Sequence, residues 1–83
     1  MNNYIATFYT QYAAIQFRTH AKKVAVPCRL APVPRSLSSS CGTCAHYTST
    51  EWDIGFASTD LQAIYKEVEG GYETLYESEG EHP

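Results

Sequence analysis

The chain has 83 residues, a net charge of −3 and three cysteines. This length allows one domain, residues 1–83, and a domain this small has a marginal core that a second copy or another partner would stabilise. An odd number of cysteines argues against a secreted disulfide framework. No secretion signal and no membrane-spanning apolar run is visible. We therefore expect a cytoplasmic protein that has no membrane partner and that can form a homo-oligomer.

Charge divides the sequence into two halves. Before residue 40 every lysine, arginine, aspartate or glutamate is a basic residue. After residue 50 every such residue except Lys66 is acidic. We interpret this as two halves that fold against each other with complementary charge. The alternative is a basic patch that attracts an anion near Cys41. Five early basic residues, an acidic total and no recognised motif do not support nucleic-acid binding.

The first elements are a strand and a helix. Tyr4–Phe8 is rich in β-forming residues and predicts a strand. Residues 9–23 predict a helix, because apolar residues recur at steps of four, four and three and so share one face. These residues are Ala13, Phe17, Ala21 and Val24.

A second strand, a loop and a third strand follow. Residues 24–33 alternate with period two, which predicts a strand in which Cys28 faces the core. Pro27 lacks an N–H donor, so this strand should lie at a sheet edge. Residues 34–42 are rich in serine and proline and predict a loop. Residues 43–50 then predict a strand, and residues 50–57 irregular structure.

The last third of the chain predicts a second helix and a closing strand. Ser58 or Thr59 can cap the helix, and Thr59 with Gln62 matches a capping box. Apolar side chains then fall at i, i+3, i+4 and i+7. These residues are Leu61, Ile64, Tyr65 and Val68. Gly70 and Gly71 should end the helix. Residues 72–77 predict the last strand, and residues 78–83 a frayed tail.

This order of elements predicts an α+β fold. Strand, helix, strand, strand, helix, strand with right-handed crossovers gives a ferredoxin-like split βαβ sandwich (βαββαβ). The sheet would be four-stranded and antiparallel, with two helices on one face. Its second and last strands would form the edges, where Pro27 and the glutamates of residues 72–77 would discourage pairing with other chains.

The loop carries the strongest chemical signal. Cys41 follows three serines and precedes a glycine, and a thiolate at this position would be a good nucleophile. Gly42 lets backbone N–H groups form an anion-binding nest, and Arg35 supplies positive charge. The hydroxyls of Ser38, Ser39 and Ser40 add hydrogen-bond donors. The alternative is a loop in which the serines only satisfy the backbone of a turn.

Cys41 and Cys44 form a CxxC motif, which has two further interpretations. A redox pair is disfavoured, because such motifs begin a helix and the residues that follow here predict a strand. A metal site could use Cys41, Cys44 and His46, although structural zinc prefers four ligands. Cys28 is assigned to the core, and no cofactor is expected.

The loop resembles the selenium/sulfur carrier protein-like family. The matching segments are Tyr4–Phe8, Val33–Gly42 (VPRSLSSSCG) and Gly71–Tyr76. The resemblance implies a carrier domain in which Cys41 holds the chalcogen and receives it from a persulfide donor such as a cysteine desulfurase. Thr43–Tyr47 departs from the family pattern, which usually has aliphatic and basic residues after the Cys-Gly pair.

Three functions remain open from the sequence. The leading hypothesis is a carrier of sulfur or selenium as a persulfide or selenide-type anion on Cys41. The second is a small metal-binding or metal-sensing module, and the third is a non-catalytic interaction domain. All three make the chain a carrier or binding protein rather than a turnover enzyme.

Overall fold

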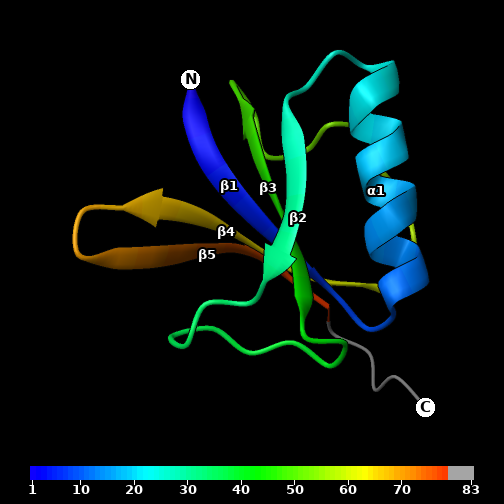
Figure 1. Ribbon diagram of the computed structural model, residues 1–83. Coiled ribbons are helices and arrows are strands. Elements are labelled where there is room, and N and C mark those ends of the chain that lie inside the picture. Colours follow the sequence, from blue (N-terminus) through cyan, green and yellow to red (C-terminus); the bar gives the residue numbers. More distant parts are fainter. Residues whose placement is uncertain (79–83) are drawn as a thin grey trace.

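The computed structural model describes residues 1–78 and contains a single antiparallel sheet with one helix packed on it (Figure 1). The sheet has five strands in the order β2-β3-β1-β4-β5. In chain order the elements are β1 (Asn2–Phe8), α1 (Gln11–Lys23), β2 (Cys28–Pro32), β3 (Thr43–Ser49), β4 (Leu61–Val68) and β5 (Gly71–Glu77).

Strand β1 is the centre of the sheet. It pairs with β3 on one side and with β4 on the other, so that Ala6 lies between Ala45 and Ile64. The side chains of residues 5–8 are all fully buried, although they alternate between the two faces. Both faces of the central strand are therefore covered, which explains its rich content of apolar residues.

Helix α1 forms where the sequence predicts it. Thr10 caps its N-terminus by accepting a hydrogen bond from the N–H of Ala13 (3.1 Å). Its buried residues are Ala13, Ala14, Phe17 and Ala21, which include three of the four predicted core positions. The fourth, Val24, lies beyond the last turn and is 44% exposed.

The core under α1 is built largely from aromatic rings. Phe17 lies 5.5 Å from Phe8, 5.1 Å from Tyr47 and 5.1 Å from Phe56, measured between ring centroids. Offset and edge-on rings at these separations stabilise a core beyond the area that they bury. Phe56 comes from residues 50–60, which connect β3 to β4 without a helix or strand.

This irregular connection takes the position that a second helix was expected to fill. Its apolar side chains, Trp52, Ile54 and Phe56, pack against the same core as α1. Two hydrogen bonds fix it, from the Tyr47 hydroxyl to the Trp52 carbonyl (2.6 Å) and from His20 Nε2 to the Ile54 carbonyl (2.7 Å). Residues 50–57 are irregular, as predicted.

The predicted ferredoxin-like sandwich is wrong, because residues 61–68 form strand β4 rather than a helix. The apolar spacing in this segment spans only eight residues, too few to separate a helix from a buried strand. Ile64, Tyr65 and Val68 are β-branched or aromatic and suit a strand. Pairing with both β1 and β5 satisfies the β4 backbone, and Gly70 (φ 85°) turns the chain into β5.

The edges of the sheet are β2 and β5, which correspond to the predicted second and last strands. Strand β2 is shorter than predicted, because it begins at Cys28 instead of residue 24. The predicted frayed tail lies outside the described residues except for Ser78, whose N–H donates to the Gln62 carbonyl (2.8 Å). Within residues 1–78 no helix is long and apolar enough to cross a membrane.

Candidate functional site

Residues 33–42 form the predicted loop, which connects β2 to β3. Its two ends are joined by a hydrogen bond from the N–H of Val33 to the carbonyl of Gly42 (3.2 Å). Inside it, the N–H of Leu37 donates to the carbonyl of Pro34 (3.0 Å) and closes a turn. Gly42 has φ 74°, a conformation that residues with a side chain rarely adopt, and it directs the chain from the loop into β3.

Two hydrogen bonds hold the loop against the ends of β1 and β4. The hydroxyl of Ser39 donates to the carbonyl of Phe8 (3.0 Å), and the N–H of Ser40 donates to Oε1 of Gln62 (3.1 Å). Gln62 is an additional residue of the candidate site, although its sequence position matches a capping box. These hydrogen bonds fix the backbone directly before Cys41, so the position of Cys41 in the fold is defined.

Cys41 lies half-buried where the loop returns to the sheet. Its sulfur donates a hydrogen bond to the carbonyl of Thr43 (3.3 Å) and lies 3.8 Å from the Ser39 hydroxyl oxygen. Its side chain also packs against the core on the α1 side of the sheet. A carbonyl accepts but cannot donate, so this arrangement suits the neutral thiol.

The other predicted site residues are placed around Cys41 in different ways. Arg35, Ser38, Ser40 and Gly42 are exposed, whereas Ser39 is half-buried beside the thiol. Within residues 1–78 no hydrogen bond or ion pair joins Arg35 to Cys41, and the Ser40 amide is bound to Gln62. The structure thus brings Ser39 and Gly42 together with Cys41 and leaves Arg35 in solvent.

The two cysteines of the CxxC motif point to opposite faces of the sheet. Cys44 is fully buried in β3, between Thr7 of β1 and Ala31 of β2, and donates to the Pro32 carbonyl (3.6 Å). All three cysteines are free thiols. Burial raises the pKa of Cys44, an effect that Arg29 partly opposes and Cys41 reinforces. Its thiol is therefore a poor nucleophile at neutral pH.

Cys28 lies half-buried on β2 and packs against the core, in agreement with its predicted core assignment. Burial raises the pKa of its thiol, and the nearby Arg18 guanidinium opposes this only in part. Two of the three cysteines are therefore held in the protonated form by their surroundings.

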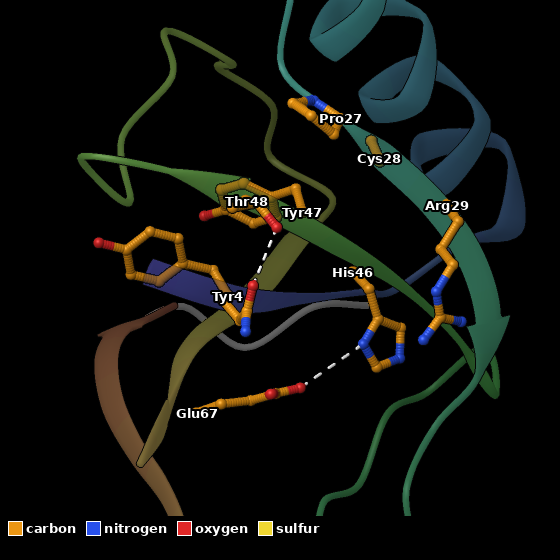
Figure 2. A pocket seen from close by; sticks show the side chains of 9 residues that line it. Tyr4, Pro27, Cys28, Arg29, His46, Tyr47, Thr48 and Glu67 are labelled. Carbon is orange, nitrogen blue, oxygen red and sulfur yellow. Dashed lines mark hydrogen bonds and ion pairs between the residues drawn. The ribbon is translucent and has the colours of Figure 1, made fainter. Parts of the chain in front are cut away.

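His46 belongs to a different site from the cysteines. Figure 2 shows it beside Arg29 of β2 and facing Glu67 of β4, with its Nδ1 3.8 Å from the Glu67 carboxylate. These side chains line a pocket of about 450 Å³. Burial and Arg29 lower the pKa of His46, and the Glu67 carboxylate, which acts in the opposite direction, does not outweigh them. His46 is therefore neutral at physiological pH.

The predicted alternative of a metal site at Cys41, Cys44 and His46 receives no support from this geometry. Within residues 1–78, no group of three or more His, Cys, Asp or Glu side chains is arranged to hold a metal ion. Alternation along β3 explains this, because it places Cys44 and His46 on one face while Cys41 packs on the other.

The fold and the loop together define a small, single-sheet domain that holds a cysteine at the end of a serine-rich loop. The family model described as "Putative Se/S carrier protein-like" matches residues 3–77, and the chain belongs to this family. The resemblance seen in the loop sequence is thus confirmed. No curated protein and no solved structure matches the chain.

Proposed function

We propose that this protein carries sulfur or selenium on Cys41. The observation that carries the proposal is the difference among its three thiols. Cys44 is fully buried, and burial raises the pKa of Cys44 and of the half-buried Cys28. Cys41 is also half-buried, but it lies in the serine-rich loop whose sequence resembles the family that the chain belongs to. The loop position therefore favours Cys41 as the thiol that a donor protein uses.

Loading on Cys41 is a thiol exchange that needs no external oxidant. The Cys41 sulfur attacks the outer sulfur of a donor persulfide, R–S–SH, and the bond between the two donor sulfurs breaks. The products are Cys41–S–SH and the donor thiol R–SH, so atoms, protons and electrons balance. A cysteine desulfurase carries a persulfide of this kind and is the donor class that we propose.

The surroundings of Cys41 suit storage rather than turnover. No hydrogen bond joins its sulfur to an acid or a histidine within residues 1–78, so no general base is in place. A persulfide or selenide anion would instead draw on donors that can reorient, namely the Ser39 hydroxyl and the exposed Arg35 side chain. Such a carrier needs a reducing compartment, so we assign it to the cytoplasm.

Intact-mass spectrometry tests the proposal. The wild-type chain is incubated with a cysteine desulfurase and cysteine, and the same is done with Cys28→Ser, Cys41→Ser and Cys44→Ser. We expect wild type, Cys28→Ser and Cys44→Ser to gain the mass of one sulfur atom, and Cys41→Ser to gain none. Replacing cysteine by selenocysteine as the donor's substrate shows which chalcogen is accepted.

Two results would contradict the carrier function. The first is loading of Cys41→Ser to the wild-type level. The second is an unmodified wild-type chain under conditions in which the same desulfurase loads an established acceptor. The second result would leave a non-catalytic interaction domain as the better description.

A further inference from the structure

The two charged halves of the sequence approach each other in the pocket that holds Arg29, His46 and Glu67, but most of their charges lie far apart. The sheet order places the basic N-terminal half, on α1 and β2, at one edge and the acidic hairpin β4–β5 at the opposite edge (Figure 1). Within residues 1–78 no lysine or arginine is paired with a carboxylate, and the contact of Glu67 with His46 (3.8 Å) would be an ion pair only with His46 protonated. The expected packing of complementary halves is therefore not made by direct pairs of a lysine or arginine with a carboxylate among residues 1–78.

The basic edge contains a groove between α1 and β2. This groove, of about 620 Å³, is lined by Arg18 and Lys22 above Val26 and Cys28. Arg18 and Lys22 are four residues apart on the helix, so their like charges repel each other. Binding a carboxylate from another molecule would remove this repulsion.

The edge strand β2 offers backbone hydrogen bonds beside the groove. The N–H of Thr48 donates to the carbonyl of Pro27 and the N–H of Val33 to that of Gly42, so alternate residues of this segment face β3. The residues between them, Cys28 and Leu30, direct their N–H groups away from the sheet. A short strand from another chain could accept these bonds.

The opposite edge ends in an acidic arm, which we define as residues 67–73 at the tip of the β4–β5 hairpin. Figure 1 shows this tip projecting beyond the rest of the sheet. Its residues Glu67, Glu69 and Glu73 are exposed, and Val68 between them is 42% exposed. An apolar side chain flanked by carboxylates complements a groove that is lined by two basic side chains and by Val26.

We infer that copies of this chain associate head to tail, with the acidic arm of one copy seated on the α1–β2 groove of the next. No residue of the arm lines the groove of its own chain, and Glu67 instead lines the separate pocket that holds Arg29 and His46. Pairing of two arms or of two grooves would bring like charges together, so each arm meets a groove, and copies that share a single arm–groove contact are joined heterologously. Repetition of such a contact produces a ring or a filament. Cys41 takes no part in this contact.

Sedimentation velocity over a concentration series tests this association. We expect wild type to grow in size with concentration at low ionic strength and to return to monomer at high ionic strength. The groove variant Arg18→Glu/Lys22→Glu and the arm variant Glu69→Lys/Glu73→Lys should each weaken self-association by about tenfold or more. Glu51→Lys/Glu77→Lys, which replaces two exposed acids outside the arm, matches the charge change of the arm variant and should associate like wild type.

A mixing experiment makes the test specific for an arm–groove contact, and here the charges are removed instead of reversed, because a reversed arm would bind a reversed groove. Arg18→Gln/Lys22→Gln keeps an intact arm and Glu69→Gln/Glu73→Gln keeps an intact groove, so the mixture should form a 1:1 heterodimer and nothing larger. Circular dichroism establishes that both variants are folded. Cys41→Ser should associate like wild type even though it cannot be loaded, which separates this inference from the carrier function.

Three results would overturn the inference. One is a wild-type chain that stays monomeric at low ionic strength up to its solubility limit. Another is an arm variant that associates as strongly as wild type. The last is a dimer of fixed size that persists at high ionic strength, which would indicate a twofold apolar interface.

Discussion

Cys41 and Cys44 are three residues apart in the sequence, yet the fold gives them opposite surroundings. Cys41 ends a loop, is half-buried and lies beside a serine hydroxyl. Cys44 sits inside β3, is fully buried and has a pKa raised mainly by burial. The comparison shows that the start of a strand, rather than the CxxC spacing, decides which thiol is available for chemistry.

Alkylation kinetics test the difference in accessibility between Cys41 and Cys44 most directly. In folded Cys28→Ser protein, we expect iodoacetamide to modify Cys41 about a hundredfold or more faster than Cys44, because Cys44 reacts only after local or global opening. Peptide mass spectrometry gives both rates in one sample. In denaturant the two rates should converge, and equal rates in the folded state would show that Cys44 is not shielded.

Measurements of the free energy of unfolding test the same difference between Cys41 and Cys44. We expect Cys44→Ala to lower the free energy of unfolding by about 1–2 kcal/mol, because it removes a fully buried sulfur and leaves a small cavity. The matched variant Cys41→Ala should lower it by less than about 1 kcal/mol. Urea denaturation monitored by tryptophan fluorescence measures both. A larger loss for Cys41→Ala would mean that the loop cysteine is structural.

Gly42, which lies between Cys41 and Cys44 in the sequence, can be tested separately. Gly42 has a positive φ with no atom near the position of a Cβ, so Gly42→Ala introduces backbone strain without a clash. We expect it to lower the free energy of unfolding by about 1 kcal/mol. Gly71 also has open space but no positive φ, so Gly71→Ala is the control and should leave stability unchanged or slightly raised.

The smallest expected effect concerns His46, which shares the helix-free sheet face with Cys44. Its folded-state pKa lies below the ordinary value because of burial and Arg29, so the unfolded chain binds the proton first. Its contribution to stability is therefore present above the ordinary pKa and is lost as the pH falls below it. Thermal melts from about pH 7.5 to about pH 5.5 should show a smaller loss of stability for His46→Gln than for wild type. An identical pH dependence would contradict this.

The elements that the sequence predicted correctly are those in which local signals and tertiary contacts agree. Tyr4–Phe8 contains β-forming residues and became the central strand, and Thr10 with the apolar spacing of Phe17 and Ala21 produced α1. Residues 61–68 are different, because their apolar spacing fits a helix as well as a strand. Pairing with β1 and β5 made this segment a strand, and that pairing cannot be inferred from the residues of the segment alone.

The candidate site was predictable in part for the same reason. The loop and Cys41 could be located from prolines, serines and a glycine, since these residues act on the backbone next to them. Gln62 could not be assigned, because it reaches the Ser40 amide from a strand 22 residues further along the chain. The position of Arg35 in solvent was equally hidden from local reasoning.

By itself the sequence determined the first strand, α1, the loop that ends at Cys41 and Gly42, and the division of charge, because each depends on residues close together in the chain. The tertiary structure alone decided that the last helix-like segment is a strand, that Cys44 is shielded and that the opposite charges lie at opposite sheet edges. Strand order and burial arise from contacts between distant residues. The energies of these contacts depend on which segments of the chain pack together. The same local pattern of apolar residues can pack against more than one other segment.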